Sequence, residues 1–67
     1  MQLTINGNVR ELDSISMNVQ NLVTLLEITG KRIAIELNGE IVPRSLFEST
    51  QLNNGDKLEI VGAVGGG

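Results

Sequence analysis

The sequence predicts an α+β domain in which a mixed sheet of four to five strands packs on one helix. Three observations predict this class. Short stretches alternate polar and apolar residues, as half-buried strands do. A single amphipathic stretch follows the helical period. Asn-Gly pairs, which favour tight hairpins, separate expected strands. With 67 residues, the chain has the length of one small domain.

The N-terminal residues predict a β-hairpin. Residues 2–6 alternate polar and apolar side chains. Asn6-Gly7 follows, and this pair is a strong hairpin signal because a type I′ turn needs positive φ at both central positions. Val9 to Asp13 is the expected returning strand. Its two apolar residues fall on opposite faces, so an edge position suits this charged strand.

One amphipathic helix is expected next. Asn18 is the predicted N-cap, with Ser16 as the alternative. Apolar residues then recur at i, i+3, i+4 and i+7 and form a broad apolar face. These residues are Val19, Leu22, Val23 and Leu26. Gly30 is expected to supply the left-handed residue that ends the helix.

The C-terminal half predicts further strands. Residues 33–37 alternate most clearly, and Asn38-Gly39 predicts a second turn. Ile41-Val42 is expected to pair back briefly before Pro43 stops regular pairing. The segment from Arg44 to Thr50 is expected to be irregular, with one short helical turn around Leu46-Phe47-Glu48.

A third turn at residues 53–56, which Asp56 is expected to close, leads to the last strand, Lys57–Val61. A hairpin at each end with a helix crossing between them gives the β-grasp arrangement, because a right-handed crossover makes this order compact. The expected core consists of Leu3, Ile5, Leu22, Val23, Leu26, Ile33, Ile35, Leu37, Leu58 and Ile60. It leaves no room for an interior cofactor.

The composition argues against several classes of function. The chain has no cysteine and no histidine, so the commonest metal ligands and the commonest general base are missing. Its net charge is −3 and it has a single aromatic residue, which does not suit nucleic-acid binding. It has no membrane-length apolar run and no signal-peptide pattern. We therefore expect a soluble, cytoplasmic protein that binds no metal, cofactor, nucleic acid or membrane.

The chain ends in Val64-Gly65-Gly66-Gly67, and this end is its most informative feature. Three glycines cannot build a core, but they form a slim arm that reaches roughly 10 Å when extended. We expect a β-grasp domain over residues 1–64 and a flexible tail over residues 65–67. In this interpretation Gly65 and Gly66 thread a partner's active site and present the Gly67 carboxylate. A frayed terminus is the alternative.

A carboxylate is a poor electrophile, so another enzyme must activate Gly67, most simply as an acyl-adenylate. Attack by a sulfur donor would then give a thiocarboxylate. The chain would be a substrate rather than a catalyst. Arg44 and Phe47 are candidate partner contacts. Arg44 is either an ordinary surface charge or an anchor for a partner's carboxylate. Phe47 is either a core residue or an exposed apolar contact.

Residues 38–44 (NGEIVPR), the Gly55-Asp56 turn and residues 63–67 (AVGGG) resemble the sulfur carrier family of thiamine biosynthesis, the ThiS type, over nearly the whole chain. That family has the ubiquitin-like β-grasp fold. Two positions depart from its pattern. Asn18 stands where Thr or Ser is more frequent, and Gly62 stands where a side chain is usual. Gly62 would either loosen the segment before the tail or alter a partner contact.

The resemblance implies that an adenylyltransferase of the ubiquitin-activating type uses ATP to adenylate Gly67. A cysteine desulfurase or another sulfur donor then supplies the sulfur of a thiocarboxylate, which thiazole synthase receives. One alternative is a sulfur carrier for molybdopterin synthesis or tRNA thiolation. Another is a non-covalent β-grasp interaction module, and a third is covalent attachment to target proteins.

Overall fold

The computed structural model describes residues 1–30 and 32–62. They form a five-stranded sheet in strand order β2-β1-β7-β4-β5, a two-stranded sheet of β3 and β6, a helix α1 and a short 3₁₀ helix η1. The bounds are β1 Gln2–Ile5, β2 Asn8–Glu11, β3 Met17–Asn18, α1 Val19–Leu25, β4 Ile33–Leu37, β5 Glu40–Val42, η1 Arg44–Leu46, β6 Gln51–Leu52 and β7 Lys57–Gly62.

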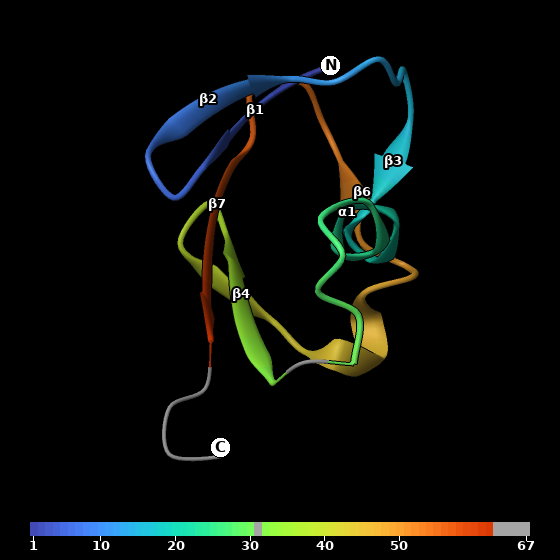
Figure 1. The fold of residues 1–67 in the computed structure, drawn as a ribbon, viewed down its shortest axis with the longest axis vertical. Coiled ribbons are helices and arrows are strands. Elements are labelled where there is room, and N and C mark those ends of the chain that lie inside the picture. Colours follow the sequence, from blue (N-terminus) through green and yellow to red (C-terminus); the bar gives the residue numbers. More distant parts are fainter. Residues whose placement is uncertain (31, 63–67) are drawn as a thin grey trace.

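The sheet confirms the predicted β-grasp arrangement. β1 and β2 form one antiparallel hairpin, and β4 and β5 form another. β7 lies between them, parallel to β1 and antiparallel to β4, so the sheet is mixed. Figure 1 shows α1 facing this sheet across the core, with β3 and β6 beside the helix. The last strand of the described residues, β7, therefore occupies the centre of the sheet.

Both Asn-Gly hairpin turns form as predicted. Asn6 and Gly7 have φ values of 51° and 84°, and Asn38 and Gly39 have 51° and 90°. These left-handed values at both central positions are those of a type I′ turn, which matches the twist of the flanking strands. The returning strand β2 ends at Glu11 instead of Asp13, and all of its residues are exposed. Its place at the edge of the sheet is confirmed.

The N-terminus of α1 is capped by Asn18, as predicted, and not by Ser16. The Asn18 side chain accepts a 2.7 Å hydrogen bond from the backbone N–H of Asn21. The Asn21 side chain in turn accepts one of 3.0 Å from the backbone N–H of Asn18. This reciprocal pair is a capping box, which satisfies two donors that the helix itself leaves open.

The prediction that Gly30 ends the helix is wrong. The left-handed residue after α1 is Glu27, with φ of 60°. Its N–H donates to Thr24 at 3.1 Å, and the N–H of Ile28 donates to Val23 at 3.1 Å, which together make a Schellman motif. Ile28 is partly buried against the core. The gain from packing Ile28 offsets the cost of a left-handed glutamate, so the helix stops earlier.

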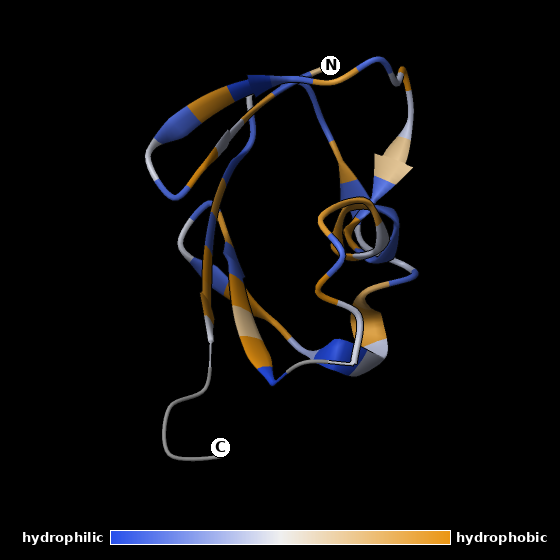
Figure 2. Ribbon diagram, in the orientation of Figure 1, coloured by the Kyte–Doolittle hydropathy of each residue, from blue (hydrophilic) through white to orange (hydrophobic). Residues whose placement is uncertain are grey.

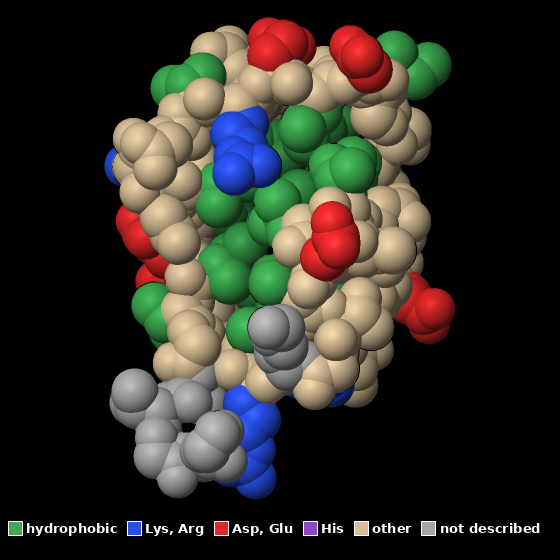
Figure 3. All heavy atoms as spheres, viewed as in Figure 1, with side chains coloured by type: hydrophobic (Ala, Val, Ile, Leu, Met, Phe, Trp, Pro, Cys, Tyr) green, Lys and Arg blue, Asp and Glu red, His purple; other side chains and the backbone are tan. Residues whose placement is uncertain are grey.

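Apolar side chains fill the space between the sheet and the helix (Figure 3), and the ribbon in Figure 2 shows hydrophobic residues along both the strands and α1. The fully or nearly buried residues are Leu3, Ile5, Met17, Val19, Leu22, Val23, Ile35, Val42, Phe47, Leu52 and Leu58. The predicted core residues Leu26, Ile33, Leu37 and Ile60 are only partly buried and pack against this cluster. The core therefore includes residues between positions 44 and 52 that the sequence does not predict to be buried.

The segment from residue 44 to residue 52 explains this shift. The predicted helical turn is present as η1, slightly earlier than expected. β6 then pairs with β3, with Leu52 opposite Met17. The carbonyls of Phe47 and Thr50 each accept a 3.0 Å hydrogen bond from the first turn of α1. The first N–H groups of a helix have no partner within the helix, and these two carbonyls satisfy two of them. The hydrogen bonds hold the segment beside α1, and its apolar residues reach the core.

Candidate functional site

The structure fixes the strand that leads into the C-terminal tail. β7 is paired on both sides, and its register with β4 continues to the pair Ile33–Gly62. Residues 63–67 follow, so the tail glycines Gly65, Gly66 and Gly67 lie outside the described residues. What the structure provides is the base from which the tail starts, at the end of the sheet opposite to the N-terminus (Figure 1).

Two hairpin asparagines hold β7 from the side. The Asn6 side chain donates to the Ile60 carbonyl at 3.0 Å and accepts from the Ile60 N–H at 2.7 Å. The Asn38 side chain accepts from the Lys57 N–H at 3.0 Å. The Asn-Gly pattern predicts the two turns, but it does not show that the asparagine side chains bind β7. For Asn6, the bound residue lies more than fifty positions away along the chain.

The start of β7 is held by the preceding turn. Asp56 accepts from the Asn53 N–H at 2.7 Å, which confirms that it closes this turn. Its other carboxylate oxygen accepts from the Asn38 side chain at 3.0 Å. The Asn54 side chain accepts from the Gln2 N–H at 2.7 Å. The turn is thereby tied to both hairpins, and this fixes where β7 enters the sheet.

Gly62 is the last described residue and belongs to β7. It is opposite Ile33, so regular pairing reaches it. Among the described residues, a Cβ atom added to Gly62 would have no atom within 4 Å, and the φ of Gly62 is not in the left-handed region. Neither backbone conformation nor crowding within the chain therefore requires glycine at this position.

The two candidate partner contacts differ in their surroundings. Arg44 is exposed and begins η1, directly after β5 and Pro43, so its role in partner binding stays a prediction. Phe47 is only 3% exposed and lies in the core cluster. Of the two alternatives for Phe47, the core residue is correct and the exposed contact is wrong. The hydrogen bond from α1 to its carbonyl holds its backbone beside the helix.

The described part of the chain offers no catalytic constellation near the end of β7. Among residues 1–30 and 32–62, no group of three or more His, Cys, Asp or Glu residues could hold a metal ion. Two shallow hollows, one lined by Met1, Ile15 and Leu52 and the other by Leu12, Met17 and Leu25, lie around the connection between β2 and β3. This connection is at the other end of the molecule from the end of β7 (Figure 1).

Within the described residues, no helix has the length and apolar character needed to cross a membrane.

A family model, a solved structure and a characterised sequence that resemble this chain all carry the same family name. The model of the ThiS family matches residues 3–67. The crystal structure of the thiamine biosynthesis protein ThiS from Geobacter metallireducens superposes with a TM-score of 0.88 at 36% identity, over 100% of both chains. The sulfur carrier protein ThiS of Bacillus subtilis (strain 168) is 29% identical over 97% of this chain and 98% of its own.

A third relative is larger. The thiazole synthase of Paramagnetospirillum magneticum (strain ATCC 700264 / AMB-1) is 46% identical over 67 residues. The match covers 100% of this chain but only 20% of that protein, so the chain spans a fifth of that relative's length. The family match reaches the final glycine, and the match to the Geobacter structure covers all of both chains. The chain therefore belongs to the ThiS family of sulfur carriers in thiamine biosynthesis.

Proposed function

We propose that the chain carries sulfur on the C-terminal carbonyl of Gly67. A partner adenylyltransferase activates the carboxylate with ATP, a sulfur donor converts it to a thiocarboxylate, and thiazole synthase receives the sulfur. Gly65 and Gly66 form the slim part of the tail that enters each active site. The observation that carries this proposal is that the family match extends to residue 67, beyond a central strand that is paired up to Gly62.

The chemistry follows from the carboxylate. One oxygen of Gly67 attacks the α-phosphorus of ATP, and pyrophosphate leaves. The acyl-adenylate has AMP as a good leaving group, so a sulfur nucleophile displaces it at the carbonyl carbon. Where the donor is a persulfide, as from a cysteine desulfurase, a thiol then cleaves the S–S bond and becomes part of a disulfide. The sulfur remains on Gly67. ATP is used by the partner, and the chain itself is substrate and carrier.

The choice of thiazole synthase as acceptor has separate support. A relative named thiazole synthase contains a stretch that is 46% identical to all 67 residues of this chain. Carrier and acceptor must meet for sulfur to pass, and joining two binding modules raises their effective concentration. The family match favours this acceptor over molybdopterin synthesis and tRNA thiolation. Because adenylation consumes ATP, we place the carrier in the cytoplasm.

Intact-mass spectrometry tests the proposed modification. The chain is incubated with ATP, the adenylyltransferase and a sulfur source. We expect the mass to rise by the difference between one sulfur and one oxygen, and fragmentation to place the gain on Gly67. The same chain with a C-terminal amide keeps every residue but lacks the carboxylate, so it should gain nothing. An unchanged mass with a competent enzyme would instead favour a non-covalent interaction module.

Deletion of Gly66 and Gly67 separates the tail from the fold. Sulfur transfer should be abolished, because the reactive carbonyl is removed. The melting temperature should hardly change, because the deletion removes no apolar side chain. Thermal unfolding and the transfer assay are measured on the same sample. A clear fall in melting temperature would show that the tail is structural and would contradict this division.

A further inference from the structure

Three asparagines in the turns of the sheet are each followed by glycine: Asn6, Asn38 and Asn54. Asparagine is a chemically labile residue, and a following glycine makes it more so. The backbone nitrogen of the next residue attacks the side-chain carbon Cγ, and glycine leaves this approach open because it has no side chain. These three turns therefore contain the amides of the chain that lose ammonia most readily.

The reaction consumes only water. The glycine nitrogen loses its proton and forms a bond to Cγ, the Cγ–Nδ2 bond breaks, and Nδ2 leaves as ammonia with a proton. The product is a succinimide ring. Water opens one of its two carbonyl–nitrogen bonds, which gives either aspartate or isoaspartate, whose backbone is one carbon longer. Either product replaces a neutral amide by a carboxylate that is ionised at neutral pH.

Two of the three asparagines are locked to the central strand β7. Both polar atoms of the Asn6 amide are bound to the backbone of Ile60, Oδ1 at 2.7 Å and Nδ2 at 3.0 Å. The Asn38 amide accepts from the Lys57 N–H and donates to the Asp56 carboxylate, each at 3.0 Å. Before Cγ can turn toward the glycine nitrogen, both bonds of the amide must break. These two asparagines are therefore free to react only when β7 leaves the sheet.

The third pair depends on a single residue. The Asn54 Oδ1 atom accepts from the Gln2 N–H at 2.7 Å, and the Gly55 N–H donates to the Gln2 carbonyl at 2.7 Å. Among residues 1–30 and 32–62, only Oδ1 of the Asn54 amide has a hydrogen-bond partner. Gln2 thus holds both the group that is attacked and the nitrogen that attacks. One local opening at Gln2 releases the two together.

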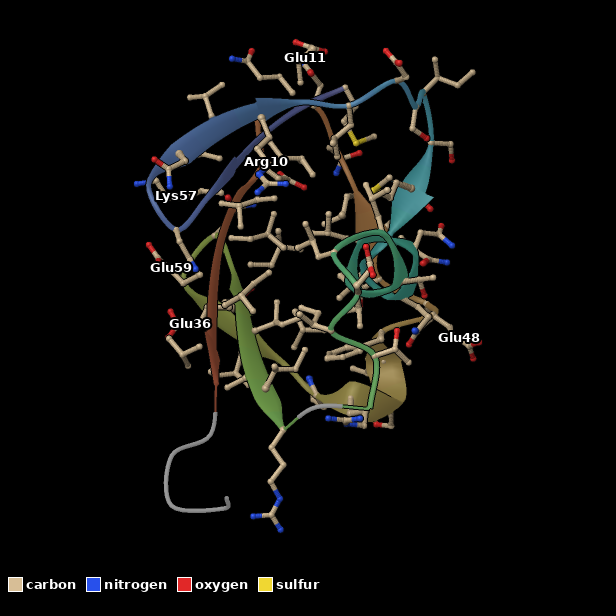
Figure 4. All side chains as sticks on the ribbon, in the orientation of Figure 1. Arg10, Glu11, Glu36, Glu48, Lys57 and Glu59 are labelled. Carbon is tan, nitrogen blue, oxygen red and sulfur yellow. The ribbon has the colours of Figure 1, made fainter. Side chains whose placement is uncertain are left out.

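Gln2 lies at the margin of the sheet. It is the exposed first residue of β1, and on its other side it is opposite Glu11 at the end of the edge strand β2. Figure 4 shows Glu11 at the periphery of the molecule, with its side chain directed away from the core. The register of β1 with β7 begins only at the pair Thr4–Lys57. Opening at such a margin costs much less free energy than unfolding a central strand.

We propose that Asn54 is a deamidation site of the folded chain, released by local opening of the Gln2 contact, whereas Asn6 and Asn38 react only when the sheet unfolds. The two products at residue 54 differ. Aspartate keeps an oxygen that accepts from the Gln2 N–H, so the turn stays in place. Isoaspartate lengthens the backbone before Gly55 and displaces its N–H from the Gln2 carbonyl. It therefore loosens the turn that fixes where β7 enters the sheet.

Peptide mapping of one sample follows all three asparagines. Trypsin cleaves after lysine and arginine, so Asn6, Asn38 and Asn54 lie in three different peptides. The full chain is incubated at mildly alkaline pH, once folded and once in guanidinium chloride, and mass spectrometry measures the conversion of each amide to a carboxyl group. In the folded chain we expect Asn54 to react on the order of tenfold faster than the other two. In guanidinium chloride the three should react at similar rates.

Asn53 is a control within the same peptide. It is exposed like Asn54 but is followed by asparagine instead of glycine, so fragmentation should find it unchanged. Hydrogen exchange measures the proposed opening without any substitution. The Gln2 and Gly55 amides should exchange faster than the Lys57 and Ile60 amides, which are bound to the two locked asparagines.

Gln2→Pro tests the contact itself. Proline removes the N–H that binds Asn54 and is tolerated at the first residue of a strand. Deamidation at Asn54 should accelerate several-fold, while Asn6 and Asn38 keep the rates of the unmodified chain. Unchanged rates at these two positions would also show that the variant is folded, because unfolding exposes all three pairs.

Two results would overturn the inference. If Asn54 reacts no faster than Asn6 and Asn38 in the folded chain, Gln2 closes its pair as firmly as β7 closes the others. If Gly55 exchanges as slowly as Ile60 and Gln2→Pro leaves the rate at Asn54 unchanged, the reaction is not released at Gln2. Neither result bears on sulfur transfer, because the modified turn is not part of the C-terminal tail.

Discussion

Strands β2 and β7 both pair with β1, one on each side, but their surroundings differ completely. β2 is the edge of the sheet, and all of its residues are exposed. β7 is the central strand, and Leu58 in it is fully buried. The backbone of β7 also accepts a hydrogen bond from the Asn6 side chain, and it donates one each to the side chains of Asn6 and Asn38.

The difference shows where the fold concentrates its restraints. An edge strand tolerates a poor apolar pattern, because it contributes little to the core, and charges there discourage pairing with other chains. The strand that leads to the C-terminal glycines is held by two neighbouring strands and by two asparagine side chains. Its inner face stabilises the domain, while its outer face is exposed. Substitutions that touch these strands should differ in size, with the largest effect at Leu58 and the smallest at Gly62.

Leu58→Ala in β7 should have the largest effect on stability. Removing a fully buried leucine side chain costs about 2–5 kcal/mol. In a domain of this size, that loss is a large part of the total free energy of unfolding. The matched variant is Val9→Ala in β2, where the side chain is 62% exposed, and it should change stability by less than about 0.5 kcal/mol. Denaturant unfolding measures both, and equal losses would contradict the contrast.

Asn6→Asp tests the side-chain contact to β7. Aspartate tolerates the left-handed turn and still accepts from the Ile60 N–H, but it places an oxygen where Nδ2 donates to the Ile60 carbonyl at 3.0 Å. A loss of about 1–3 kcal/mol is expected, since the carbonyl loses its donor and faces a negative charge. Asn8→Asp in β2 makes the same change in charge and should be nearly neutral. Hydrogen exchange at the Ile60 amide should accelerate only in the Asn6 variant.

Gly62→Ala at the end of β7 should have the smallest effect. The added Cβ meets open space, and alanine loses less conformational freedom than glycine, so a gain of about 0.4–1 kcal/mol is expected. Thermal unfolding measures it. If Gly62 serves only to loosen the strand end, KM with the adenylating enzyme is unchanged. A destabilised variant would show that the strand end has contacts that the described residues do not contain.

Local chemistry made much of the fold predictable. The Asn6-Gly7 and Asn38-Gly39 turns and the Asn18 cap form as expected, because each depends on residues within four positions along the chain. The end of α1 was predicted at Gly30 and this prediction is wrong, although the end of a helix is also a local feature. Glycine at residue 30 is the better left-handed residue, but the burial of Ile28 favours the turn at Glu27.

Burial was the harder part. Phe47 is a core residue because α1 donates a hydrogen bond to its carbonyl, and Leu52 is buried because β6 pairs with β3. These contacts join residues about thirty positions apart, so no periodicity in a short window can indicate them. The opposition of Glu36 and Glu59 depends in the same way on the register between two distant strands.

The hairpins and the helix start follow from neighbouring residues alone, because turn geometry and capping are local properties. The central place of β7, the choice of buried apolar residues and the pairs of side chains that face each other across the strands become visible only in the folded chain. These features arise when strands from both ends of the chain pair, and the register of that pairing depends on the packing of the whole core.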